Sequence, residues 1–170
     1  MSRAWGIRGI WLALALVLVL LWSTPTAWAS IHTYPEGAEQ VMYRSLQTLR
    51  DRRDQAWQVV LFKRVQSGQV VDLHLRLVGF PGVAELKHPH TLRITTGTEQ
   101  VWEVAEASTE GSIAPNVGEY DLREVLLQLN SNTPLRLQLP TNGQAEELLV
   151  PPFVVQEWRR VLDLLPLSVG

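Results

Sequence analysis

The sequence predicts an α+β fold: a mostly antiparallel, curved or partly closed β-sheet of about six or seven strands, with two amphipathic helices at about residues 121–130 and 151–164. Two observations predict this class. Segments in which apolar and polar residues alternate recur between turns containing glycine or proline, which is typical of antiparallel hairpins. The two helical segments instead repeat apolar residues every three or four positions, so each has one apolar face to pack over a sheet.

The predicted sheet begins with an ambiguous segment. Residues 39–50 fit either a helix or a strand, and the hairpins that follow favour a strand. Residues 57–65, with the sequence WQVVLFKRV, are β-branched and aromatic and are expected to form a strand. Residues 71–77 alternate apolar and polar side chains, which predicts a half-buried strand, and a turn around Gly68 joins the two segments.

Two further pairs of strands are expected. Residues 91–95 and 100–104 form a hairpin around a short turn that contains glycine. After a polar loop and the first helix, residues 135–139 and 147–150 form the last two strands, because leucine alternates with polar residues in the first of them.

Both helices carry recognisable start signals. Asp121 is expected to cap the first helix, and Glu124 three residues later completes a capping box. Pro151 and Pro152 open the second helix, where the missing N–H of proline costs no hydrogen bond.

Residues 1–29 have the organisation of a secretory signal peptide. Arg3 and Arg8 provide the positive start, and the run from Ile10 to Trp22 is apolar throughout. This run is shorter than the about 20 residues that a bilayer-spanning helix needs. Small residues at the ends of the segment 27–29 suit a signal peptidase, so the prediction is a removable signal cleaved after Ala29.

The mature chain is then expected to have an extended lead-in at residues 30–37, a single α+β domain at 38–170 and no transmembrane segment. Removing the signal takes away two of the 15 basic residues and none of the 17 acidic ones, so the net charge falls from −2 to about −4. A negative chain is not expected to bind nucleic acid. The sequence has no cysteine, which excludes a thiol nucleophile, a Cys-based metal site and a lipid anchor.

The densest charged segment is residues 50–54. One interpretation is a solvated turn between two strands. The other is a docking patch whose guanidinium groups bind an acidic partner or a lipid headgroup, extended by neighbouring basic residues if these fall on the same side. The candidate partner-binding residues are Arg50, Asp51, Arg52, Arg53, Asp54, Lys63 and Arg64.

Three histidines are the candidate metal ligands: His74, His88 and His90. Three imidazoles with an open coordination position suit zinc or copper, and the alternative interpretation is that the His88–His90 segment is a solvated turn. Asp72, His74 and Ser45 are the residue types of a hydrolase triad, but no nucleophile elbow surrounds any serine. The expectation is a protein that is not an enzyme and has no cofactor.

Several segments of the chain resemble one known family. They are residues 31–34 (IHTY), 42–45 (MYRS), 49–51 (LRD), 56–64 (AWQVVLFKR) and 151–158 (PPFVVQEW). Together they resemble a family of small exported cyanobacterial proteins of unknown function. The resemblance implies a location in the periplasm or the thylakoid lumen, and a general similarity to accessory proteins of photosynthetic complexes. It supplies no catalytic residues.

Three functions follow, in order of preference. The first is an exported, non-enzymatic accessory domain that binds a protein partner, such as a photosynthetic membrane complex. The second is a binder of a small hydrophobic ligand, a lipid or pigment, in an apolar pocket enclosed by the curved sheet and the two helices. Whether Phe62, Leu75, Trp102 and Trp158 leave a cavity or interdigitate distinguishes this function from the first. The third is a metalloprotein or hydrolase built on the histidines.

Overall fold

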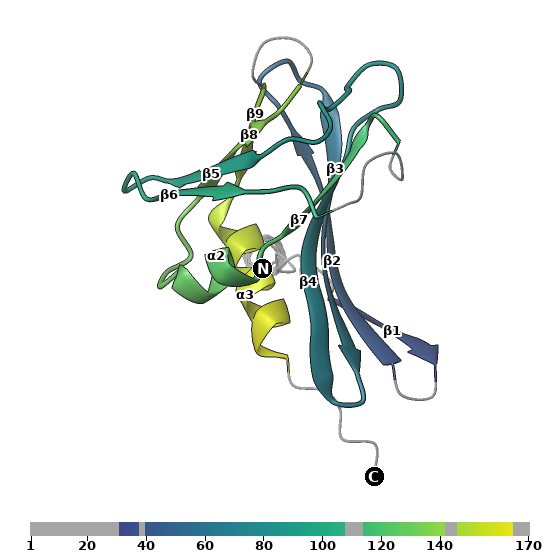
Figure 1. Cartoon of the computed structure of the whole chain (residues 1–170). Helices are drawn as coiled ribbons and strands as arrows, with labels where there is room; N and C mark the ends of the chain where they lie inside the picture. The colour runs from purple at the N-terminus through teal and green to yellow at the C-terminus, as the bar shows by residue number, and fades with distance from the viewer. Residues whose placement is uncertain (1–30, 38–39, 108–113, 142–145, 165–170) are drawn as a thin grey trace, which may run out of the picture.

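The computed structural model describes residues 31–37, 40–107, 114–141 and 146–164. The predicted signal peptide and its cleavage site therefore lie outside the described residues. Within these ranges the chain forms nine strands and two helices, labelled in Figure 1. The strands are β1 (His32–Gly37), β2 (Gln40–Arg50), β3 (Ala56–Gln66), β4 (Gln69–Val78), β5 (Leu92–Thr96), β6 (Val101–Val104), β7 (Val117–Asp121), β8 (Leu135–Leu139) and β9 (Glu146–Val150). The helices are α2 (Arg123–Gln128) and α3 (Pro152–Asp163).

The strands form two antiparallel sheets, not the single sheet that the sequence predicts. The five-stranded sheet has the order β1-β2-β3-β4-β7, and the four-stranded sheet has the order β6-β5-β8-β9. The antiparallel α+β class is confirmed, but the count of six or seven strands is wrong and neither sheet closes on itself. A second sheet forms because β5 pairs with β8, while the position beside β4 is taken by β7.

The first strand lies within the segment predicted as an extended lead-in. The segment 32–37 pairs with β2 along most of its length, from His32 opposite Arg44 to Gly37 opposite Gln40. It is thus an edge strand of the five-stranded sheet. Residues 39–50 fit either a helix or a strand in the sequence, and the structure confirms the preferred prediction, because Gln40–Arg50 forms strand β2.

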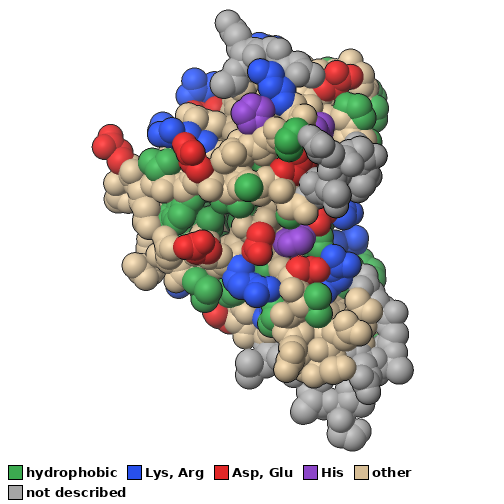
Figure 2. All heavy atoms as spheres, in the orientation of Figure 1, with side chains coloured by type: hydrophobic (Ala, Val, Ile, Leu, Met, Phe, Trp, Pro, Cys, Tyr) green, Lys and Arg blue, Asp and Glu red, His purple; other side chains and the backbone are tan. Residues whose placement is uncertain are grey.

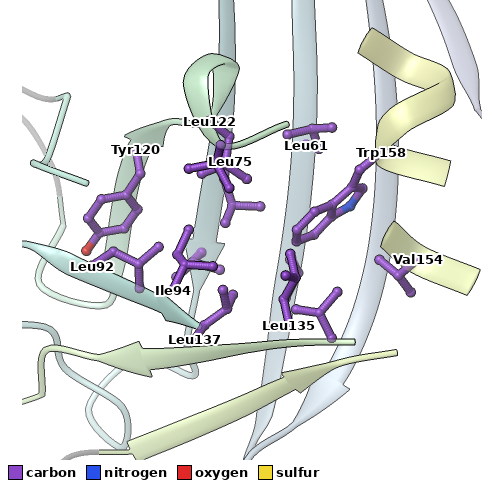
Figure 3. Packing of buried hydrophobic residues seen from close by; sticks show 14 of the residues in the cluster. Leu61, Leu75, Leu92, Ile94, Tyr120, Leu122, Leu135, Leu137, Val154 and Trp158 are labelled. Carbon is purple, nitrogen blue, oxygen red and sulfur yellow. The ribbon is translucent and has the colours of Figure 1, made fainter. Parts of the chain in front are cut away.

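The core lies between the two sheets and is covered by the helices (Figure 1). In β4, Leu73, Leu75 and Leu77 are fully buried, as their alternation with polar residues predicts. Figure 3 shows how the buried side chains of the two sheets meet. From the five-stranded sheet come Leu61, Leu75 and Tyr120; from the four-stranded sheet come Leu92, Ile94, Leu135 and Leu137; and from α3 come Val154 and Trp158.

The two helices agree with the predictions in kind and differ in their bounds. Helix α3 begins at Pro152, as expected, and buries Val154 and Trp158. Helix α2 is only six residues long, and Leu122 occupies its N-cap position. Asp121 ends β7 instead, although its Oδ1 still accepts a 2.9 Å hydrogen bond from the Arg123 N–H. Neither described helix is long and apolar enough to cross a membrane.

Isolated bridges join the sheets at their margins. Asp51 pairs with Leu148 where the β2–β3 turn meets β9. On the opposite margin, Glu106 pairs with Tyr120 of β7 as the chain leaves β6. The chain therefore crosses between the sheets just after β6, and α2 follows directly after β7. This connection places the edge strand β6 next to α2.

Candidate functional site

The charged turn between β2 and β3 is organised around Asp51, which is only 7% exposed. Its Oδ1 accepts hydrogen bonds from the backbone N–H groups of Arg53 and Gln55. Its Oδ2 accepts a 2.9 Å hydrogen bond from the indole Nε1 of the buried Trp57. Asp51 therefore holds the turn and the core together, and its carboxylate is not presented to a partner.

Two arginines of the same turn bind acidic residues of the other sheet. Arg53 Nε lies 2.8 Å from Glu146 Oε1, and Arg52 Nη2 lies 2.9 Å from Glu147 Oε1. Both glutamates belong to β9, so the pairs link the two sheets. The segment predicted as a docking patch thus makes ion pairs within the chain, and its role toward a partner stays a prediction.

Lys63 and Arg64 do not extend this turn as one surface, because neighbouring residues of a strand point to opposite faces. Lys63 is 4% exposed, and its Nζ donates 2.7 Å hydrogen bonds to the carbonyls of Leu162 and Leu164 at the end of α3. Burial lowers the pKa of Lys63, with Asp163 opposing the effect. Arg64 lies on the outer face and pairs with Asp72, 2.7 Å away.

The candidate metal ligands bind different partners. His74 Nδ1 lies 2.7 Å from Glu119 Oε1, whereas His88 Nδ1 lies 2.7 Å from Glu106 Oε1. His90 Nδ1 instead accepts a hydrogen bond from the backbone N–H of the next residue. Among the described residues, no group of three or more His, Cys, Asp or Glu is arranged to hold a metal ion. The metal-site interpretation therefore has no geometric support there.

The hydrolase arrangement is contradicted by the sheet. Ser45 pairs with Leu61 on the inner face of the five-stranded sheet and is fully buried. His74 pairs with Phe62 and lies on the outer face. Because the sheet separates the serine hydroxyl from the imidazole, the two cannot act as nucleophile and base.

An ionic cluster on the outer face surrounds Glu119. Arg76 donates to Glu119 Oε2 from Nε and Nη2, at 2.9 and 2.7 Å, while His74 contacts Oε1. Burial opposes ionisation of this carboxyl, but the hydrogen bonds from His74 and Arg76 outweigh it and lower the pKa of Glu119 below 4.5. Arg76 also lies over the ring of Phe62, with Cζ 5.3 Å from the ring centroid.

The sequence did not predict the open groove between β6 and α2. The groove has a volume of about 680 Å³, and Figure 2 shows hydrophobic and acidic side chains on the face of the molecule where it lies. It is lined by residues of β6, of the segment that follows β6, of the end of β7 and of α2. These residues are Val101, Trp102, Glu103, Val104, Ala105, Asp121, Arg123, Glu124, Val125 and Leu127.

The floor of the groove is apolar and partly exposed. Trp102 pairs with the buried Ile94, so both side chains lie on the inner face of the four-stranded sheet. Because β6 is the edge strand, Trp102 and Val104 are only partly covered by the core. The Trp102 Nε1 donates a 2.7 Å hydrogen bond to Gln128 Oε1, which ties the strand to α2.

The rim of the groove combines exposed apolar and acidic side chains. Leu127 is 66% exposed and Val101 is 42% exposed. The carboxylates of Glu103, Asp121 and Glu124 outnumber the single guanidinium of Arg123 among the lining residues. Arg93 Nη1 lies 3.5 Å from Glu103 Oε1 on the neighbouring strand, and because both side chains are exposed, this pair holds Glu103 only weakly.

One signal in the sequence points toward the groove. Leu127 does not belong to the apolar face by which α2 packs on the core, and its side chain is exposed. An apolar residue on the polar face of a helix can mark a contact surface. The four residues that distinguish a cavity from a filled core, Phe62, Leu75, Trp102 and Trp158, do not face one common space. Leu75 and Trp158 are fully buried in the core, and Phe62 lies on the opposite face of its sheet.

Comparison with known proteins places the chain in a family. The family model described as "Protein of unknown function (DUF3122)" matches residues 29–161, which is most of the 170-residue chain, so the chain belongs to this family. No curated protein matches the chain, and no solved structure does. The resemblance to a family of unknown function is thereby confirmed.

Proposed function

We propose that this member of the family is an exported, non-enzymatic accessory domain that binds a protein partner in the groove between β6 and α2. The observation that carries the proposal is the partly exposed apolar floor of Trp102 and Val104 beside the exposed Leu127. Contiguous apolar surface with a polar rim is typical of interaction sites. The catalytic arrangements weighed from the sequence have no corresponding geometry among the described residues.

Export is supported by the pattern of the first 29 residues, and the expected compartment is the periplasm or the thylakoid lumen. The partner in that compartment is a protein, such as a membrane complex of the photosynthetic apparatus. N-terminal sequencing of the protein recovered from cell fractions tests export. Ser30 as the first residue is the expected result, and an intact N-terminus in the cytoplasmic fraction would contradict it.

The partner site is tested by recovery of bound proteins from membranes with an affinity-tagged full-length chain. Leu127→Asp places a charge on the rim of the groove and is expected to abolish recovery of the partner. Leu149→Asp is the matched control, because Leu149 is 54% exposed on β9 and does not line the groove. Equal recovery with both variants and the unmodified protein would overturn the proposal.

A hydrophobic small ligand is the second candidate for the same groove. Its volume of about 680 Å³ lies within the range of small-molecule sites, and the partly buried Trp102 is among the residues that line it. Native mass spectrometry of the gently purified protein separates the candidates. A co-purifying small molecule that is lost in Leu127→Asp favours the ligand, and a bare protein mass favours the protein partner.

A further inference from the structure

Strand β6 lies at the edge of the four-stranded sheet and lines the groove. In the described part of the chain, β6 has one neighbouring strand, β5, and its other edge has no paired strand. In an antiparallel edge strand, alternate residues direct their N–H and C=O groups away from the neighbour. A peptide segment that runs beside such a strand satisfies these groups by joining the sheet.

We infer that the groove binds an extended peptide segment that adds to the sheet beside β6 and alternates apolar with basic residues. This inference rests on the groove being the partner site proposed above. It specifies how the partner is held: by main-chain hydrogen bonds to β6 and by side chains that alternate between the groove and the outer surface.

The alternation follows from the two faces of β6. Trp102 and Val104 point to the inner face, where they form the floor with Val125 of α2. An added strand would direct every second side chain onto this floor, so those side chains should be apolar. A four-residue edge strand pairs with about four residues of an added segment, so a six-residue peptide covers it and extends about one residue beyond each end.

The basic residues follow from the charge of the rim. Glu103 lies on the outer face of β6, and its carboxylate would be the cross-strand neighbour of an outward side chain of the added strand. Asp121 and Glu124 add negative charge from the other wall of the groove. Opposite charges across neighbouring strands are favourable and like charges are not, so the outward side chains should be Lys or Arg.

The test is a titration of the full-length protein with a capped six-residue peptide that alternates valine and arginine. Binding is expected, and the same peptide with glutamate in place of arginine should not bind. Two N-methylated versions remove the peptide N–H groups of alternate residues. The set that faces β6 should weaken binding about tenfold through lost hydrogen bonds, and the other set should leave it unchanged.

Protein variants complete the test. Glu103→Arg is expected to weaken binding of the arginine peptide several-fold and to improve binding of the glutamate peptide. Glu99→Arg is the matched control, because Glu99 lies in the β5–β6 turn and does not line the groove. Equal weakening by both N-methylated sets, or an unchanged charge preference in Glu103→Arg, would overturn strand addition. If no alternating peptide binds but Leu127→Asp still loses the native partner, strand addition is wrong and the groove keeps its proposed function.

Discussion

The guanidinium of Arg53 and the carboxylate of Glu146 lie 2.8 Å apart, and they join the two sheets of the domain. Arg53 belongs to the turn between β2 and β3, and Glu146 is the first residue of β9. The Glu146 side chain is only 8% exposed, so its charge depends on this partner. A segment that looks like a solvated charged turn in the sequence is therefore part of the junction between the sheets.

Removal of the arginine should destabilise this junction. Arg53→Ala leaves the nearly buried Glu146 carboxylate without its ion pair, and the expected loss is about 1–3 kcal/mol in the free energy of unfolding. Arg52→Ala is the control, because its pair with Glu147 is exposed on the arginine side and should contribute about 0–1 kcal/mol. Urea unfolding measures both, and equal losses would contradict the prediction.

Asp51→Asn tests whether the carboxylate organises the turn. The side chain accepts from the backbone N–H groups of Arg53 and Gln55 and from the Trp57 indole. Whichever way the new amide turns, its NH₂ group faces at least one of these donors, so a loss of about 1–3 kcal/mol is expected. Thermal unfolding checks it against Asp54→Asn, whose side chain is exposed, and a similar melting temperature for both variants would refute the assigned role.

The cluster around Glu119 predicts a pH dependence. Its folded pKa lies below the ordinary value of 4.5, so the folded state binds fewer protons there than the unfolded state. The resulting stabilisation is complete above about pH 4.5 and is lost as the pH falls through the lower folded value. Glu119→Gln should therefore make the free energy of unfolding fall less steeply as the pH drops below about 5.

The measurement is a series of urea unfolding curves across this pH range. Glu99→Gln is the matched control, because it removes an exposed carboxylate in the β5–β6 turn and should leave the pH slope close to that of the unmodified protein. If Glu119→Gln keeps the full slope, the cluster does not contribute to acid sensitivity.

Gly79 is a position where the fold has no room for a side chain. A Cβ atom there would lie 2.6 Å from the Cβ of Ala84 and 2.9 Å from the Trp57 ring. Gly79→Ala should therefore cost about 1–3 kcal/mol through overpacking. Gly97→Ala is the control, since its nearest atom would be Thr133 Oγ1 at 3.9 Å. Differential scanning calorimetry should show a lower melting temperature for Gly79→Ala than for Gly97→Ala, and equal melting temperatures would contradict the prediction.

Strand and helix positions followed closely from local patterns. The alternation in residues 71–77 predicted β4 and its buried leucines, and the double proline predicted the start of α3. The short helix was less accurate: β7 continues to Asp121, so the residue expected to cap the helix ends a strand instead. Boundaries of this kind depend on which strand the segment pairs with, and pairing partners lie far away in the sequence.

The candidate sites depended still more on the tertiary structure. Lys63 and Arg64 are adjacent in the sequence and end on opposite faces of β3, one capping α3 and the other pairing with Asp72. The groove escaped prediction because its floor and its rim come from β6 and α2, which are joined only by a long excursion of the chain.

The sequence by itself determined the antiparallel α+β class, most of the strands, the export signal as a prediction and the membership of a family of unknown function. Those features depend on local periodicity and composition, which each segment carries on its own. Only the tertiary structure decided that there are two sheets, that Arg53 of one pairs with Glu146 of the other, and that the edge strand β6 lines a groove together with Leu127. These features depend on which distant segments pack against one another. The free energy of that packing is a property of both segments together, so it cannot be read from either one alone.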